Sequence, residues 1–347
     1  MADGLKFGIT ESGVLHTSAD APLDLDTKFR WVKGSGYDYL DKTPPADQEA
    51  DYRRCIEKYE LPMLAGGWYY TLGRDEALLE QNLRLGARLG SRVHNTQIMM
   101  DHADGRLVTD AEVAEAYLRA HDVGAAVGCL PTFEVHVNMW SEDFRRVARV
   151  ADLVERRGVP FLMTLDHSHV IFKIDNPREQ AVFGIDRAIA SGELVLDPYQ
   201  PGNVCDIWIG RGLVGHAHAR PVIPNNPRNI WGRHESLDRL PSSLHPKDLT
   251  GRGIQYPFIA PKPGEYHSPW DGAKLEPWKE VVRHLFAWRA ARPASGFTTI
   301  STEMIPFPDY GDGGKYSIFE NSVALARWLR EAWAEAQAAA GARPAAE

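Results

Sequence analysis

The sequence predicts one α/β domain of the (β/α)8 TIM-barrel type. About eight short apolar segments alternate with stretches of helical periodicity. A helix that follows each strand returns the chain to the same edge, so repeated units of this kind give parallel strands. A chain of 347 residues accommodates eight such units with insertions. The alternative, an open doubly wound sheet, is less favoured because neither GxGxxG nor GxxxxGK[ST] follows a predicted strand.

The first half of the chain alternates short strands with longer amphipathic helices. Thr109 and Glu112 form a capping-box pattern, which predicts the start of one helix. Leucines in 74–89 recur at near-helical spacing. The expected strands are 5–11, 37–41, 62–70 and 92–99, and the expected helices are 48–60, 74–89 and 109–127.

The second half continues the same alternation. Residues 131–138 alternate strictly between polar and apolar, which predicts a strand. Residues 141–157 carry one apolar stripe, with Ser141 as the expected N-cap and Gly158 as the stop. The other expected strands are 160–166, 213–219 and 297–304, and the other expected helices are 177–190, 276–292 and 320–337.

One region interrupts this order. Residues 220–275 are rich in proline and contain tryptophans, and a long irregular connection of this kind is usually functional or disordered. We expect an ordered insertion after the seventh strand, within a single domain that spans 1–337. The Ala-rich residues 338–347 are expected to form a disordered tail.

Composition narrows the classes of function. The formal net charge is −8 and no basic block is present, which argues against nucleic acid as a partner. No secretory signal and no apolar run long enough to cross a bilayer is found, so we expect no membrane association. The three cysteines have no CxxC spacing, which favours a reducing compartment and a cytoplasmic location.

Acidic and imidazole side chains collect near the ends of four consecutive predicted strands. The carboxyl ends of barrel strands meet at one rim, where active sites of this fold lie. In chain order these candidate site residues are Glu134, His136 and Asn138, then Asp166 and His169, then His216 and His218, and finally Glu303.

This set predicts a site for one divalent cation. Packing three carboxylates together without a counter-charge is costly, and a cation removes that cost. The expected ligands are Glu134, Asp166, His218 and Glu303, with His216 as an alternative to His218. Carboxylate and imidazole ligands without thiolate favour Mn²⁺ first, with Mg²⁺ and Co²⁺ as alternatives.

The ordered set resembles the xylose isomerase-like TIM-barrel superfamily, which includes ketose 3-epimerases, inosose dehydratases and endonuclease IV-type nucleases. The resemblance covers most of the chain and lies in TFEVHVN, in Asp166-x-x-His169, in His216-x-His218 and in STEM. In the sugar-handling members the matching residues hold one Mn²⁺ or similar ion. In ketose epimerases the two metal-bound glutamates, here Glu134 and Glu303, also move protons.

A closer resemblance is to the large (alpha) subunit of bacterial C-glycoside deglycosidases. It lies in the Glu134-x-His136 pair followed by MWSEDFRRV, whereas the run after His218 fits the epimerase pattern poorly. This resemblance implies a metal-dependent lyase that cleaves the carbon–carbon bond of 3-oxo-C-glycosides, with His136 as acid/base and a small β-rich subunit as partner. The catalytic residues would be His136, Glu134 and Glu303.

Other residues are candidates for contact with a glycoside or keto sugar. Aromatic rings suit stacking on a sugar face or a flat aglycone. The candidates for substrate contact are His169, His216, Arg220, Asn138, Trp68 and Trp140. Alternatives to the lyase are an isomerase, epimerase or dehydratase of a ketose or inosose, a nuclease, which the charge disfavours, and a non-catalytic binding barrel.

Overall fold

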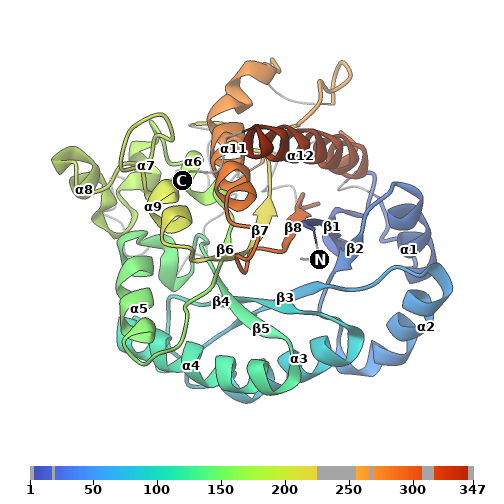
Figure 1. Ribbon diagram of the computed structural model, residues 1–347, viewed down its shortest axis with the longest axis horizontal. Helices are drawn as coiled ribbons and strands as arrows, with labels where there is room; N and C mark the ends of the chain where they lie inside the picture. Colours follow the sequence, from blue (N-terminus) through green and yellow to red (C-terminus); the bar gives the residue numbers. More distant parts are fainter. Residues whose placement is uncertain (1–3, 18–19, 225–254, 266–268, 307–315, 343–347) are drawn as a thin grey trace.

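The computed structural model describes residues 4–17, 20–224, 255–265, 269–306 and 316–342. Its eight strands form a closed barrel in sequence order, and every neighbouring pair is parallel, including the β1–β8 pair that closes it (Figure 1). The predicted (β/α)8 fold is therefore confirmed. The strands are β1 Lys6–Thr10, β2 Tyr39–Asp41, β3 Ala65–Tyr70, β4 Val93–Ile98, β5 Leu130–Glu134, β6 Met163–Leu165, β7 Val214–Ala219 and β8 Thr299–Thr302.

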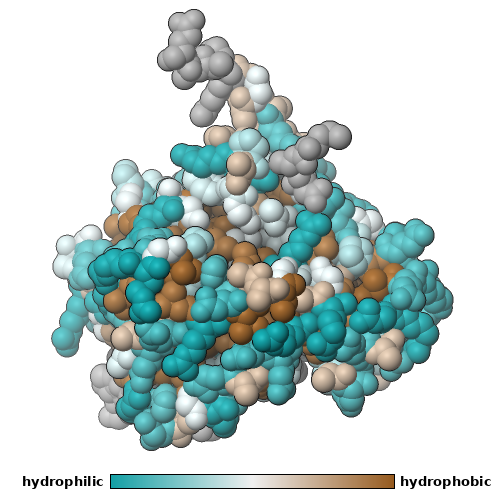
Figure 2. Space-filling view, turned by 60° about the horizontal axis from the view of Figure 1, so that its bottom comes forward, coloured by the Kyte–Doolittle hydropathy of each residue, from teal (hydrophilic) through white to brown (hydrophobic). Residues whose placement is uncertain are grey.

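Helices surround the barrel on its outside (Figure 1). Between them and the strands lies the main hydrophobic core, which contains Trp208 and Trp278. The helices are α1 Leu25–Gly34, α2 Glu49–Tyr59, α3 Glu76–Leu89, α4 Asp110–Val127, α5 Arg145–Glu155, α6 Ser168–Ile171, α7 Pro177–Gln180, α8 Ile185–Ser191, α9 Val204–Gly210, α11 Glu276–Ala290 and α12 Ile318–Gly341. The face seen in Figure 2 is mainly hydrophilic, with smaller apolar areas between polar residues. No helix of the described chain is long and apolar enough to cross a membrane.

Helix ends follow the sequence where a local motif specifies them. The predicted capping box at the start of α4 is present: Glu112 N donates to Thr109 Oγ1 (3.2 Å), and Thr109 N donates to Glu112 Oε2 (2.9 Å). The helices α1, α6 and α9 were not predicted. The helices α6 and α9 are too short, at four and seven residues, for an apolar period to be evident, whereas α1 has Leu25, Phe29 and Val32 at helical spacing, a signal that the prediction left unused.

Several predicted boundaries are wrong in the segment that follows β5. The strand ends at Glu134, not at residue 138, because the chain turns at Asn138, whose φ is +63°. Ser141 lies in a 3-10 turn, Trp140–Glu142, and its hydroxyl bonds the loop instead of capping a helix. The helix α5 therefore begins only at Arg145. The predicted helix 177–190 is interrupted at Phe183, where φ is +58°.

The predicted insertion and tail are described only in part. After β7 the chain is described to residue 224 and again from 255, where Tyr256 N donates to Pro221 O (2.8 Å). Residues 225–254 and 266–268 of the insertion lie outside the described residues. The helix α12 continues to Gly341, four residues beyond the expected boundary, because its last turns are rich in alanine, the strongest helix former. Residues 343–347 lie outside the described chain.

A glycine in β1 leaves room for a buried tyrosine of the barrel interior. A Cβ at Gly8 would lie 2.3 Å from the ring of Tyr39, which is fully buried. The Tyr39 hydroxyl is 2.8 Å from Ser301 Oγ, so a displaced ring would also disturb that contact. We expect Gly8→Ala to lower the free energy of unfolding by about 1–3 kcal/mol, the usual cost of overpacking a core. Denaturant unfolding measures the free energy of unfolding of this variant. The control is Gly34→Ala, because a Cβ at Gly34 meets open space.

Candidate metal centre

Three of the predicted ligands converge at the carboxyl end of the barrel. Glu134 ends β5, His218 lies in β7, and Glu303 directly follows β8. His218 Nδ1 lies 3.1 Å from Glu134 Oε1 and 3.3 Å from Glu303 Oε2. All three side chains are buried, and one ligand atom from each falls within 4.8 Å of the other two. Strands β5, β7 and β8 thus deliver two oxygens and one nitrogen to a single point.

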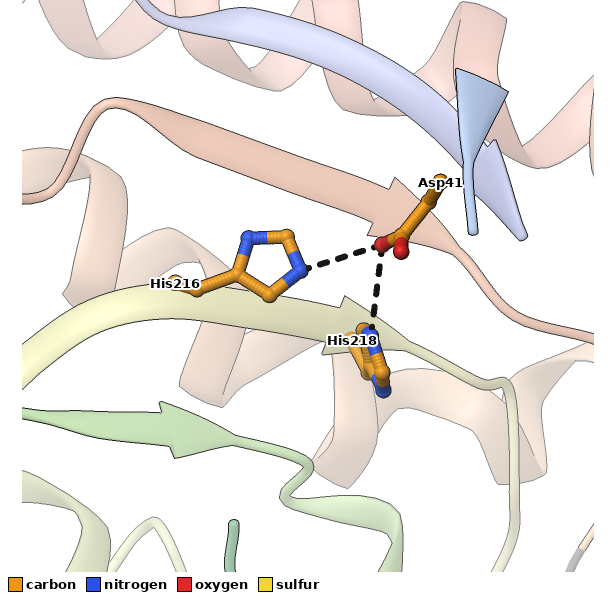
Figure 3. Close-up of side chains that lie close together, drawn as sticks. All are labelled: Asp41, His216 and His218. Atoms are coloured by element: carbon orange, nitrogen blue, oxygen red, sulfur yellow. Dashed lines mark hydrogen bonds and ion pairs between the residues drawn. The ribbon is translucent and has the colours of Figure 1, made fainter. Parts of the chain in front are cut away.

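A fourth acidic residue, Asp41, faces His218 from the other side. Asp41 is the last residue of β2, and its Oδ2 lies 3.3 Å from His216 Nε2 and 3.5 Å from His218 Nε2 (Figure 3). Asp41 is absent from the predicted ligand set, although it ends the predicted strand 37–41 just as the predicted ligands end theirs. His218 is therefore placed between three carboxylates.

These charges make the centre favourable for a cation. Burial alone disfavours a charged imidazole, but Glu303, Glu134 and Asp41 outweigh it and hold the pKa of His218 well above its ordinary value. Burial also opposes the charged form of Glu303, yet His218 and Arg220 lower the pKa of that carboxyl. Within the described part of the chain, Glu303 Oε2 and His218 Nε2 have no hydrogen-bond partner although both are buried. Of these two atoms, Glu303 Oε2 belongs to the converged group. An unpartnered buried carboxylate oxygen at a point that attracts positive charge fits a divalent cation.

The orientation of Glu134 is fixed by two amides of β4. Asn95 Nδ2 and Gln97 Nε2 both donate to Glu134 Oε2, at 2.7 and 2.5 Å. These bonds leave Oε1 to face His218. Carboxylate ligands of metals are commonly held by such hydrogen bonds, so the fixed Oε1 is consistent with a ligand role.

Asp166, the fourth predicted ligand, has other partners here. Its carboxylate accepts hydrogen bonds from Arg220 and from Ser168 Oγ (2.6 Å), and His169 Nε2 lies 3.2 Å away. Burial opposes the charge, but Arg220 and His169 hold the pKa of Asp166 well below its ordinary value. Arg220 also lies 3.4 Å from Glu303 and so links Asp166 to the three converged residues. Coordination by Asp166 stays a prediction.

His136 lies on the loop that follows β5, beside His169. The two ring centroids are 4.0 Å apart, and desolvation by burial lowers the pKa of each to about 4. His136 Nδ1 lies 2.6 Å from Val137 O. Because a carbonyl only accepts, Nδ1 carries the proton and Nε2 keeps its lone pair. The loop is held by Ser141, whose Oγ accepts from His136 N (3.1 Å) and donates to Glu134 O (2.7 Å). His136 is thus a neutral base whose backbone is linked to that of Glu134 through the Ser141 hydroxyl.

Three predicted substrate contacts lie deeper than expected. His216 is fully buried, and its Nδ1 faces Thr299, so it lies outside the group formed by Glu134, His218 and Glu303. Trp140 is 2% exposed and belongs to the main hydrophobic core, so its predicted stacking on a sugar is not supported. Asn138 is also buried, and its N–H donates to Glu142 Oε2 (2.6 Å), which fixes the loop.

A cavity of about 180 Å³ opens on the centre, and a larger one adjoins it. His218, Glu303 and Asp41 line the smaller cavity together with Trp68 and Tyr69. The last two rings are stacked with centroids 4.9 Å apart and are 39% and 45% exposed. Trp68 also lines the larger cavity, of about 440 Å³, which is mostly apolar. The other residues of the larger cavity include Pro44, Pro45, Leu78 and Leu85. Trp68 therefore stands between a polar and an apolar cavity.

Comparison with solved structures identifies the fold. No family model and no curated protein matches the chain. Among solved structures, a D-allulose 3-epimerase from Methylomonas sp. matches with a TM-score of 0.52 and 12% identity, over 97% of this chain and 100% of that one. A 3-keto-D-glucoside 4-epimerase from E. coli matches with a TM-score of 0.50 and 14% identity, over 94% and 99% of the two chains. A xylose isomerase domain protein from Alicyclobacillus acidocaldarius matches with a TM-score of 0.51 and 15% identity, over 96% and 99%.

Proposed function

We propose that this chain, which has the fold of the xylose isomerase-like TIM barrels, is a divalent-metal-dependent enzyme that acts on a keto sugar. The reaction that we propose is cleavage of the carbon–carbon glycosidic bond of a 3-oxo-C-glycoside. The observation that carries this proposal is the pairing of a cation-ready group, Glu134, His218 and Glu303, with a neutral base, His136, on the loop that leaves Glu134.

Glu134, His218 and Glu303 would hold the cation, with Asp166 as a fourth ligand. A divalent ion there supplies a Lewis acid that polarises a keto oxygen, which acidifies the neighbouring carbon. Mn²⁺ is our first candidate for an oxygen-rich site with one imidazole, ahead of Mg²⁺ and Co²⁺. For Asp166 to join, Arg220 must release it, and the guanidinium would then be available to bind a substrate oxygen.

In the proposed reaction His136 Nε2 takes the proton from C2 of the keto sugar. The C2–H electron pair becomes the C1=C2 double bond, the bond from C1 to the aglycone breaks, and the aglycone carbon takes up a proton. One proton is removed and one is added, so no water or redox partner is consumed. His136 suits the first step because its Nδ1–H donates a hydrogen bond to Val137 O. The lone pair of Nε2 is therefore free to accept the proton from C2.

The two adjoining cavities support a substrate larger than a free monosaccharide. The smaller cavity, with its charged and amide side chains, suits a polyhydroxylated ring, and the exposed Trp68 and Tyr69 suit stacking at its edge. The apolar cavity beyond Trp68 suits an aglycone. A polar cavity next to an apolar one suits a glycoside with a hydrophobic group at C1.

A second candidate is an epimerase, isomerase or dehydratase that uses the same centre. Glu134 and Glu303 both lie beside His218 Nδ1, at 3.1 and 3.3 Å, and two carboxylates this near one point can exchange protons with one substrate. One neighbour of the same fold is named as a 3-keto-D-glucoside 4-epimerase, which by that name also acts on a keto glycoside.

We further propose a small β-rich partner subunit and a cytoplasmic location.

Substrate turnover separates the two candidates. The Mn²⁺-loaded protein is incubated with a 3-oxo-C-glucoside, with a 3-oxo-O-glucoside and with a free ketose, with and without the candidate partner, and products are followed by chromatography. We expect release of the free aglycone from the C-glucoside. Epimerised or isomerised sugar without aglycone release would replace the lyase by the second candidate. No turnover of any of the three would contradict both.

A further inference from the structure

Asp41 occupies a position that the predicted ligand set does not explain. Its side chain is 5% exposed, and its Oδ2 accepts a hydrogen bond from Ser301 Oγ (2.6 Å) and one from His216 Nε2 (3.3 Å). His218 Nε2 lies 3.5 Å from the same oxygen and is otherwise unpartnered within the described residues. Two strands, β7 and β8, thus direct donors at one carboxylate oxygen from β2. Figure 3 shows the two histidines of β7 beside Asp41.

We propose that Asp41 is a positioning residue, which holds His218 so that Nδ1 presents its lone pair to the cation. This inference rests on the proposed metal centre. The two nitrogens of His218 face different acids: Nδ1 faces Glu134 and Glu303, and Nε2 faces Asp41. A neutral imidazole has one lone pair and one N–H. A carboxylate opposite Nε2 keeps the proton there, so Nδ1 is left as the donor to the metal.

The same geometry argues against Asp41 as a ligand of a second ion. Asp41, His216 and His218 do form a compact group of possible ligand atoms. However, the oxygen that faces His218 already accepts hydrogen bonds from Ser301 and His216. Because a carboxylate only accepts, His216 presents an N–H to this group and no lone pair for an ion. A neutral His218 also cannot donate a lone pair to two ions at once. The group therefore serves the ion beside Glu134 and Glu303.

The test is a Mn²⁺ titration by calorimetry of the full-length protein and of Asp41→Asn and Asp41→Ala. Removing such an outer carboxylate typically weakens metal binding by about 10–100-fold. We expect a loss in this range for Asp41→Ala and a smaller loss for Asp41→Asn, whose amide oxygen can still accept the Nε2 proton. The matched control is Asp38→Asn. Asp38 directly precedes the same strand, contacts Phe7 N and Arg330, and its replacement should leave the Mn²⁺ affinity unchanged.

Each outcome separates this inference from the metal centre itself. If the wild-type protein binds no Mn²⁺, both proposals fail. If it binds one ion with the same affinity in all three Asp41 forms, only the positioning role fails. Two ions in the wild type that fall to one in Asp41→Ala would make Asp41 a ligand and overturn the inference.

A second measurement does not depend on the stability of the variants. Long-range ¹⁵N–¹H spectra of the Mg²⁺-loaded wild-type protein, with ¹⁵N-labelled histidine, report which imidazole nitrogen carries the proton. We expect His218 to be protonated at Nε2 and not at Nδ1. The opposite tautomer would overturn the role of Asp41 even if the protein binds metal.

Discussion

Replacing His136 by Ala is expected to reduce turnover of the keto-glycoside by about 10²–10⁴-fold, the range that a positioned general base contributes. Metal content should be retained, because Glu134, His218 and Glu303 converge without the His136 imidazole. The measurement is kcat on the 3-oxo-C-glucoside together with bound metal per chain. Loss of metal in His136→Ala would instead make this histidine a support for the ligands.

The matched control for this variant is His167→Gln. His167 is also a buried histidine whose pKa burial lowers to about 4, but its ring packs on Trp278 and its Nε2 donates to Trp278 O. It lies outside the group formed by Glu134, His218 and Glu303. Its replacement should lower stability while leaving kcat per folded molecule intact. Equal losses of kcat in the two variants would show that the effect of His136→Ala comes from the loss of a buried ring.

Replacing Glu303 by Gln is expected to abolish tight binding of the divalent ion and, with it, measurable turnover. The change replaces one of the three converged charged donors by a weaker neutral amide and removes part of the negative charge that favours a cation. Lewis-acid catalysis contributes several kcal/mol, and since each ~1.4 kcal/mol is tenfold in rate, a loss of at least about 10²-fold follows. Chelation of the wild-type protein should reproduce the loss, and added Mn²⁺ should reverse it.

Thermal denaturation provides an independent readout of the same change. An ion that binds the folded chain raises its stability in proportion to the logarithm of ion concentration. Mn²⁺ should therefore raise the Tm of the wild type and of Glu280→Gln, a variant in an exposed ion pair of α11, but not that of Glu303→Gln. Equal Mn²⁺-induced shifts of Tm in all three proteins would show that Glu303 is not a ligand. They would favour a non-catalytic binding barrel without this metal centre.

The local pattern predicted more of the framework than of the loops. Strands and helices with a clear period were found, and the capping box at Thr109 was correct in detail, because such signals depend on neighbours within four residues. The alternation through 131–138 was misleading after Glu134. There the side chains of Ser141 and Glu142 bond the loop backbone in place of a strand ladder, and no local period records such bonds.

The choice between His216 and His218 shows where sequence reasoning ends. Both lie on the same face of β7, so alternation cannot separate them. Their positions along the barrel axis separate them. His218 lies beside the two glutamates, whereas His216 lies between Thr299 and Asp41. The contacts of Arg220 with Asp166 and Glu303 likewise depend on how far a long side chain reaches across the barrel.

By itself the sequence determined the parallel barrel and the rim at which its acidic and imidazole residues gather, because the order of strands and helices dictates both. Only the tertiary structure decided which of those residues meet, which nitrogen of His218 faces the two glutamates, and that Asp41 stands behind it. These outcomes depend on distances between side chains of strands far apart in the chain, and such distances are set by the register and closure of the whole barrel.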